Sequence, residues 1–428
     1  MMNFRFLVLI ASVALLWGGC RKTETPEPPA SSTFELIFYN KFNLLEAQFA
    51  VFLSDADGKV RAFRWLPAND SAHVTVPGAT SKEQFDCTVV KITTVLSPGT
   101  GIQDTVVSLT TYTNLYNGAG IHLHDPNFLQ STDWHIQFTN VVSIDSIIVP
   151  ESLTFTRPQA ANNFEGQYRV LHTGRFWCRL RINGEAGWRY VLFDSVNTAT
   201  LDTTLDASVL PAIPAPTAAI ALPLLAPWSY QIDRVVDVAK QEFLAIGAPL
   251  RVPGGAVPVL NKLDVYEPPN LPYGGYRLRL SGFDDAAGEG YTCDQYFDTL
   301  PAAIPPLGFD IQPTVLADNR LVGVLCSGIF DLLSFTRVRN APPSLSWEVL
   351  VPPSTDNGLV TYRLPDVPAE LSARFAGLGS YDFDGAVRVR AENYDQLNTY
   401  PEAAARRMLL DDPLWQMKTG YQARERVF

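Results

Sequence analysis

Three of the five histidines in this chain lie within fourteen residues, at His122, His124 and His135. Side chains two apart on a strand point to the same face, so a strand here would place His122 beside His124. A returning strand would then bring His135 next to them. Three imidazoles can hold a zinc ion and leave its fourth position open to water. The spacing predicts a zinc site as one interpretation and an ordinary polar strand edge as the other.

Acidic loops give a second set of candidates, this time for calcium. Residues 55–58 read Asp-Ala-Asp-Gly, and 382–385 repeat the same spacing. Calcium takes about six to eight oxygen ligands, and its loop sites place a bidentate glutamate at the twelfth position, where this chain has Leu66 and Asn393. We therefore expect hairpin turns at both loops and a solvated loop at 284–290. The sequence implies no cofactor beyond these candidate zinc and calcium ions.

A hairpin of aromatic and basic residues is the best candidate for ligand recognition. The segments 175–182 and 188–196 are joined by Asn183-Gly184, which tolerates the positive φ angles of tight turns. Strict alternation sends one set of side chains to the core, namely Phe176, Cys178, Leu180 and Ile182. It leaves the other set facing solvent, namely Trp177, Arg179, Arg181, Trp188 and Tyr190. Aromatic faces stack on sugars and arginine donates to hydroxyls or carboxylates, so this second set is the predicted ligand-binding face. The alternative is that the face packs against a neighbouring domain or against the Pro-rich segment 209–228.

Enzyme motifs are mostly absent from the sequence. It holds no G-x-S-x-G elbow, no H-E-x-x-H helix, no phosphate-binding loop and no dinucleotide fingerprint. Cys326-Ser327-Gly328 has no histidine near it in the sequence. Carboxylates are plentiful, yet nothing selects one pair for glycoside hydrolysis. A metal-dependent hydrolase using the three histidines and a carboxylate-based glycosidase remain alternatives, and no catalytic residue is predicted.

The composition describes the scaffold that must position these residues. The 428 residues carry a formal net charge of −11, which becomes −12 when Arg5 is removed with the N-terminal leader. So acidic a chain offers no broad basic surface, which argues against nucleic acid as a partner. The abundance of proline, valine, threonine and aromatics predicts an all-β, mainly antiparallel protein. We expect two or three β-sandwich domains of immunoglobulin-like architecture.

Strand signals begin at Phe34 and recur about every eight to twelve residues, which is typical of sandwiches. The first hairpin is expected over 47–53 and 60–66. The predicted organisation follows in chain order: a β-sandwich over 34–160, a β-hairpin with a Pro-rich segment and a helix over 161–270, and a β-sandwich with a C-terminal helix over 271–428.

Two helices are predicted within this β scaffold. Apolar residues recur at helical spacing over 232–246, charged residues take the opposite face, and Gly247 follows as a stop signal. The second helix is expected over 401–410. Pro401 suits its first turn, and Glu402 interacts favourably with the positive end of the helix dipole.

Four cysteines lie in the predicted β regions, at Cys87, Cys178, Cys293 and Cys326. In an oxidising compartment they allow up to two disulfides, with three possible pairings. Cys293 and Cys326 fall in one predicted domain, so this pair is favoured. Buried free thiols are the alternative.

The first residues have the pattern of an export signal. Arg5 precedes an apolar run from Phe6 to Trp17, which is too short to cross a bilayer and suits a signal peptide. The run ends in Gly18-Gly19-Cys20. This resembles the lipobox of bacterial lipoproteins, and the resemblance implies that residues 1–19 are removed and that the Cys20 thiol is acylated. Residues 20–33 are rich in proline and small polar residues, which predicts a disordered tether.

Together these features predict a lipoprotein held by its lipid in the bacterial cell envelope, at the outer membrane, facing the periplasm or the exterior. The layout of lipid, tether and stacked β modules is similar to that of accessory lipoproteins in outer-membrane polysaccharide-uptake systems. This resemblance implies a non-catalytic module that binds a polysaccharide or another envelope protein. A hydrolase and a structural or assembly protein of the envelope stay as alternatives.

Overall fold

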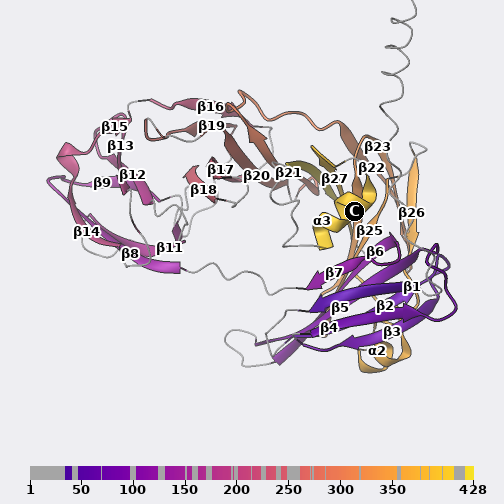
Figure 1. Ribbon diagram of the computed structural model, residues 1–428. Coiled ribbons are helices and arrows are strands. Elements are labelled where there is room, and N and C mark those ends of the chain that lie inside the picture. The colour runs from indigo at the N-terminus through magenta and orange to yellow at the C-terminus, as the bar shows by residue number, and fades with distance from the viewer. Residues whose placement is uncertain are drawn as a thin grey trace, which may run out of the picture.

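The computed structural model of the chain is almost entirely β-structure (Figure 1). It describes residues 34–428 with gaps at 41–46, 69, 97–102, 124–130, 150–151, 157–161, 170–175, 194–195, 197–200, 214, 223–227, 238–241, 248–260, 270, 272–273, 285, 318–319, 354–357, 376, 385, 398 and 409–419. The leader, Cys20 and the tether therefore lie outside the described residues. Within the described part, α-helix is confined to α2 (Ala369–Arg374) and α3 (Tyr400–Met408). The predicted all-β, mainly antiparallel fold is confirmed.

One long sheet of twelve strands runs through the molecule. In spatial order its strands are β18 (Glu242–Gly247), β17 (Trp228–Asp237), β20 (Tyr276–Asp284), β21 (Glu289–Phe297), β28 (Tyr421–Val427), β27 (Val387–Tyr394), β24 (Leu332–Arg339), β25 (Ser344–Val351), β6 (Gln103–Leu115), β5 (Phe85–Leu96), β2 (Ala47–Ser54) and β3 (Val60–Leu66). Neighbours are antiparallel throughout except β25 and β6, which are parallel. The predicted first hairpin is confirmed as β2 and β3.

A small sheet covers the β3 end of this long sheet. It consists of β4 (Asp70–Val76), β1 (Phe34–Asn40) and β7 (Gly120–Leu123) in that order. Alternate residues of β1 point inward, so Phe34, Leu36 and Phe38 are fully buried against the long sheet. Helix α3 adds Ala403 and Ala404 to the same core. The predicted C-terminal helix is thus confirmed, and its small side chains let it pack closely.

Two four-stranded sheets form a second sandwich. One sheet is β10 (Ser152–Thr156), β11 (Asn163–Arg169), β8 (Ser131–Thr139) and β14 (Leu201–Asp206). The other is β15 (Ala212–Ile213), β13 (Trp188–Phe193), β12 (Phe176–Ile182) and β9 (Ile144–Ile148), and the short 3-10 helix η1 (Ala207–Val209) follows β14. The core between them is aromatic, with Trp134, Phe164 and Phe176 at 1% exposure or less. Figure 1 places this sandwich at one end of an arch.

Two further small sheets cover the rest of the long sheet. β22 (Phe309–Ala317), β23 (Leu321–Gly328) and β26 (Leu359–Arg363) enclose a core centred on Trp347 and Phe335. The pair β16 (Ala218–Ala221) and β19 (Lys262–Val265) packs over β17, β20 and β21. Each apolar face of the long sheet is therefore buried by a second layer, as expected for sandwich folds.

The helix predicted over 232–246 is wrong. This segment is the antiparallel hairpin of β17 and β18. The apolar spacing misled because β17 is covered on both faces: the consecutive residues Ile232 and Asp233 are both 0% exposed. A strand buried on both sides loses the two-residue period, and its apolar positions can then imitate a helical spacing.

The apolar cores show which strands belong together, although the predicted division at residues 160 and 270 stays a prediction. One core joins strands from β8 to β14, and another joins β16 to β21 with Trp177 of β12. The described helices include none that is long and apolar enough to cross a membrane.

Candidate functional site

The predicted recognition hairpin forms as expected from its turn. β12 and β13 are antiparallel, and Gly184 in the connecting turn has φ +90°. Arg179 pairs directly with Tyr190, so these two residues lie on one face of the hairpin, as predicted. The prediction of a shared face is confirmed.

The predicted exposure of that face is wrong for Trp177 and Arg179. Trp177 is 0% exposed and Arg179 is 4% exposed. Trp177 packs into the core beneath β17 and β20, and its indole Nε1 donates to the carbonyl oxygen of Ala245 at 2.6 Å. The face packs against a neighbouring layer because β12 carries apolar residues on both sides. Ligand binding by Trp177 is difficult to reconcile with this burial.

Aromatic rings surround the buried Arg179 guanidinium. Its central carbon lies 4.8 Å from the ring centre of Trp188 and 4.9 Å from that of Tyr266. Its Nη1 donates to the carbonyl oxygen of Tyr266 at 3.2 Å. Burial lowers the pKa of Arg179 to about 10, which still leaves the side chain charged at neutral pH.

The other three members of the predicted face differ from these two. Trp188 and Tyr190 are half-buried, and Arg181 is exposed beside Asp145, with 3.9 Å between Nε and the nearer carboxylate oxygen. Only Arg181 among the five therefore faces solvent as the alternation predicted.

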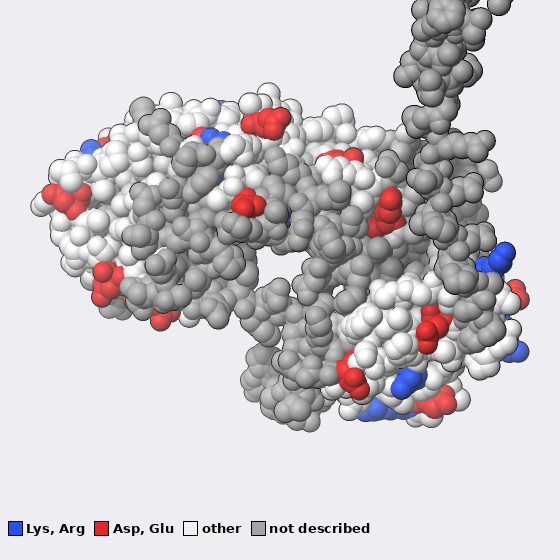
Figure 2. All heavy atoms as spheres, viewed as in Figure 1, with Lys and Arg blue, Asp and Glu red and all other residues white. Residues whose placement is uncertain are grey.

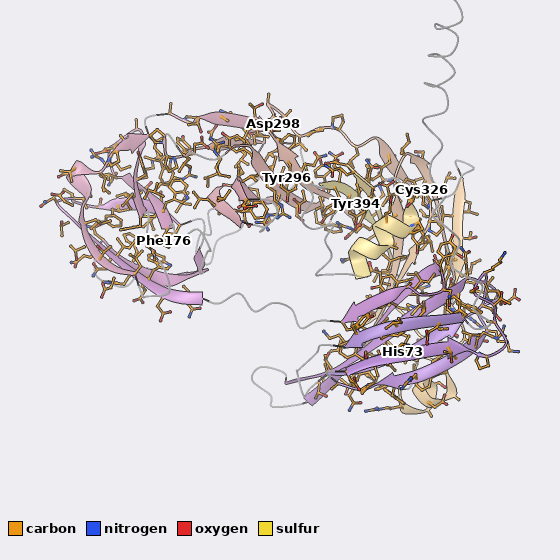
Figure 3. All side chains as sticks on the ribbon, viewed as in Figure 1. His73, Phe176, Tyr296, Asp298, Cys326 and Tyr394 are labelled. Atoms are coloured by element: carbon orange, nitrogen blue, oxygen red, sulfur yellow. The ribbon has the colours of Figure 1, made fainter. Side chains whose placement is uncertain are left out.

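Of the three candidate zinc ligands, the two whose backbone is described lie on separate sheets. His122 lies on β7, His124 lies outside the described residues, and the side chain of His122 is not described either. His135 lies on β8, where its Nδ1 contacts Asp202 Oδ1 at 2.9 Å. His73, labelled in Figure 3, has a similar contact with Glu35 at 2.9 Å. In the described part of the chain, no three metal-ligating side chains converge.

The predicted disulfide does not form. Cys87, Cys178, Cys293 and Cys326 are all buried, and none of these four forms a disulfide. Cys293 belongs to the core beneath β16 and β19, whereas Cys326 belongs to the core around Trp347. Shared membership of one predicted domain was therefore a poor guide to contact. Burial raises the pKa of each of these two thiols to about 12, which keeps them protonated and unreactive.

The acidic loops use their carboxylates to fix turns. Asp55 Oδ1 accepts from the amide of Lys59 at 2.9 Å, and Asp384 Oδ2 accepts from Asn340 Nδ2 at 2.8 Å. Asp284 Oδ1 accepts from the amide of Ala286 at 2.9 Å. The Asp55 and Asp284 bonds are local side-chain to backbone contacts that stabilise turns. Asp384 instead bonds a side chain 44 positions away and lies between α2 and β27, so the hairpin turn expected at 382–385 is wrong.

A different site emerges at the β3 end of the long sheet. Among the described residues β2 is the one strand that pairs with β3, so the far edge of β3 is open in the sense that no described strand pairs with it. The nearby β4 contacts β3 through a side chain: Arg64 Nη1 donates to the carbonyl oxygen of His73 at 2.6 Å. Beside β3 lies a hollow that we call the edge groove. Its lining comes from two segments, 59–63 of β3 and its turn, and 366–370 at the start of α2.

The edge groove has an apolar floor and a charged rim of both signs. Val60, Phe63 and Val367 are partly buried against the Trp347 core. Lys59 and Arg61 stand on the strand side, and Asp366 and Glu370 stand on the helix side. Figure 2 shows the same mixture of charge over the lobe that contains β1 to β6.

An aromatic and arginine patch continues the groove along β3. Trp65 is 37% exposed and meets Phe63 edge to face, with 5.7 Å between ring centres. The guanidinium carbon of Arg374 on α2 lies 5.4 Å from the Trp65 ring centre and 5.3 Å from that of Phe375. Tryptophan and arginine are the residues most enriched at binding hot spots.

Backbone contacts hold the two walls of the edge groove together. The amide of Asp366 donates to the carbonyl oxygen of Gly58 at 2.7 Å. Gly58 has φ +80°, and a Cβ there would lie 3.1 Å from Pro365 Cα. Arg320 binds the same segment through Asp366, at 2.9 Å. The sequence did not reveal this site because its walls lie about three hundred positions apart, and only the turn signal at Gly58 indicated one of them.

Comparisons with known proteins define no family for the chain. No family model matches it, and no curated protein sequence matches it. Among solved structures, the C-terminally truncated tip fimbrial protein Mfa3 from Porphyromonas gingivalis is 10% identical, with a TM-score of 0.15, over 38% of this chain and 80% of that one. A streptococcal ancillary pilin is 8% identical, with a TM-score of 0.13, over 64% and 98%. The Bacillus anthracis TIE protein is 9% identical, with a TM-score of 0.11, over 91% and 73%.

Proposed function

We propose that this protein is a lipid-anchored protein of the bacterial cell envelope that binds an extended segment of another envelope protein along β3. The open edge of β3 beside the edge groove is the observation that supports this function. An unpaired edge presents backbone donors and acceptors to an incoming strand. In strand-addition complexes the backbone gives affinity, and neighbouring pockets give specificity for alternate side chains.

The chemistry of the groove favours a protein over a polysaccharide. Its rim carries both signs of charge, which suits a peptide with mixed side chains more than a uniform sugar chain. The guanidinium of Arg374 lies over Trp65, so one face of that ring is already covered. A stacking sugar would have to use the other face or displace the arginine.

Peptide selection on the purified soluble form tests the proposal. Peptides are selected from a random displayed library, and their affinity is measured by fluorescence anisotropy. We expect Trp65→Ala to weaken the selected peptides at least tenfold, because truncation of a hot-spot side chain costs about 2 kcal/mol or more. Tyr116→Ala is the matched control, since Tyr116 is another exposed aromatic, at 55%, outside the groove.

Two results would contradict the proposal. One is that the selected peptides bind the Trp65→Ala variant as well as the native protein. The other is that a glycan array yields ligands that depend on Trp65 while the peptide library yields none, in which case polysaccharide binding replaces protein binding.

The membrane anchor requires its own experiment. The lipobox at Cys20 is the observation that supports it. Mass spectrometry of the native N-terminal peptide should find Cys20 as the first residue, with acyl chains attached. Cys20→Ser should release the protein from the membrane fraction, and an unmodified Cys20 in the native protein would reject the anchor.

A further inference from the structure

Arg179 sits where two apolar cores meet. On β12, Phe176, Cys178 and Leu180 point into the core of the second sandwich, and Trp177 points into the core beneath β17. Arg179 shares the Trp177 face by alternation. Its neighbours come from three other elements: Trp188 on β13, Tyr230 on β17, and Tyr266 directly after β19. Junctions between packed layers are common places for small-ligand sites.

Three partly buried arginines on β17 and β20 show how this protein satisfies such a charge elsewhere. Arg277 holds Asp294 with Nε at 2.8 Å and Nη2 at 2.7 Å, which is a two-pronged contact along one edge of the guanidinium. Arg234 pairs with Glu267 at 2.8 Å, and Arg279 pairs with Asp233 at 2.8 Å. Each of these partly buried arginines is thus matched with a carboxylate.

Arg179 is the exception among these residues. It is more than nine-tenths buried, and no described carboxylate pairs with it. Of its five N–H groups, the hydrogen bonds to the described residues use one, from Nη1 to Tyr266. Its buried Nε has no acceptor among the described residues; the Nε atoms of Arg234 and Arg279 share this, but each of those side chains holds a carboxylate through Nη2. The aromatic rings steady the guanidinium, yet the edge formed by Nε and Nη2, which Arg277 uses to hold Asp294, has no described partner.

We propose that the Nε and Nη2 edge of Arg179 binds the carboxylate of a small ligand, at the junction lined by Trp188, Tyr230 and Tyr266. A carboxylate matches the fork of a guanidinium in shape and supplies the two acceptors that this edge requires. Its single negative charge equals the single positive charge present. A phosphate dianion would bring a second charge that no described neighbour at this junction balances. The site is separate from the edge groove and does not depend on the proposed function.

The experiment measures carboxylate binding by the purified soluble protein at constant ionic strength. The probes are sodium acetate and sodium glucuronate, with glucose and sodium phosphate as comparisons. We expect saturable binding of the carboxylates by calorimetry and a rise in the melting temperature of several degrees. Glucose and phosphate should produce neither effect. Glucuronate binding stronger than acetate binding would identify an acidic sugar as the ligand type, and the reverse order would indicate a simpler acid; both orders support a carboxylate site.

Variants and one direct signal connect the effect to Arg179. Arg179→Gln should abolish carboxylate binding, and Arg179→Lys, which keeps the charge and loses the fork, should weaken it at least tenfold. Arg181→Gln is the matched control on the same strand and should bind normally. If the Arg179 variants do not fold, the Nε–H resonance of Arg179 in the labelled native protein should still shift on titration with acetate or glucuronate. Absence of saturable carboxylate binding by the native protein, binding of phosphate in its place, or unchanged binding by Arg179→Gln would overturn the proposal.

Discussion

The two end strands of the twelve-stranded sheet differ in how other parts of the molecule cover them. At one end, β18 is covered: Leu244 and Ile246 are 0% exposed, and Trp177 from another sheet donates to the Ala245 carbonyl oxygen. At the other end, Trp65 on β3 is 37% exposed; in the described part of the chain each of these two end strands has one ladder partner, so the contrast lies in what covers them. An edge covered by a packed tryptophan contributes to stability, whereas an open edge is available for binding or must be protected by charge. The difference gives the β18 end a structural role and agrees with the recognition proposed for the β3 end.

Among the substitutions that test this contrast, truncation of Trp177 should cause the largest loss in the free energy of unfolding. Trp177→Ala deletes a fully buried indole and should lower the free energy of unfolding by about 3–5 kcal/mol. Trp177→Phe keeps much of the apolar contact and loses the hydrogen bond to Ala245, so its loss should be about 1–3 kcal/mol. Urea unfolding measures both values. A cost below about 1 kcal/mol for Trp177→Ala would mean that β18 does not need this cover.

Substitution of Gly58 tests how firmly the two walls of the edge groove are joined. Gly58→Ala must hold an alanine at φ +80° with its Cβ 3.1 Å from Pro365 Cα, so we expect a loss of about 2 kcal/mol in the free energy of unfolding. Gly184→Ala is the control, because its φ is +90° and nothing lies within 4 Å of the added Cβ. It should cost about 1 kcal/mol. Equal losses at both glycines would show that the contact with Pro365 is unimportant.

Truncation of Trp65 should change binding far more than stability. Trp65→Ala removes a partly exposed ring and its contact with Arg374, so we expect a loss of about 1 kcal/mol in the free energy of unfolding. Thermal and urea unfolding of the variant check this value. A loss as large as that of Trp177→Ala would show that Trp65 is a core residue, and the two sheet ends would then be alike.

The smallest effect at neutral pH is expected from Asp86, which lies near the open end. Burial raises the pKa of Asp86, while hydrogen bonds from the Asn114 amide and the Tyr362 hydroxyl lower it and the nearby charge of Asp55 raises it. Because the folded-state pKa is above the unfolded one, the folded state binds protons more tightly. This contribution to stability is present at low pH and is lost as pH rises through the raised folded-state pKa.

Asp86→Asn removes that titration. The variant should therefore lose less stability than the native protein between pH 3 and pH 7, and at neutral pH it should be nearly as stable or slightly more stable. Urea unfolding across this pH range measures the difference in slope. Parallel pH profiles for the two proteins would show that Asp86 does not titrate abnormally.

Local patterns predicted much of the fold. The Asn183-Gly184 turn and the acidic turn before β3 gave correct hairpins, because such turns restrict the backbone whatever packs around them. Patterns failed where both faces of a strand are buried. Over 232–246 this burial produced a false helix, and on β12 it hid Trp177. The spacing of apolar residues indicates whether one or both faces of a strand are apolar. It does not show which other part of the molecule packs on a face that carries polar residues.

The candidate sites were predicted only in part. Arg179, Trp188 and Tyr190 were correctly grouped on one face. Tyr266, which also contacts Arg179, belongs to a segment distant in the sequence and was not predicted. The edge groove was not predicted, because its walls meet through tertiary contacts between remote parts of the chain. A carboxylate partner for Arg179, or its lack, is also a tertiary property. Sequence alone could name the residue and could not describe its surroundings.

The parallel contact between β6 and β25 has a consequence for biogenesis. These strands are separated by more than half the chain. The backbone groups on the outer edge of β6 therefore have no strand partner until β25 has been made and has folded. During synthesis, an early folding unit would therefore expose the unpaired edge of β6 until the later part of the polypeptide is available. Such a chain is prone to self-association, and a chaperone that shields β6 would raise the yield of correctly folded protein.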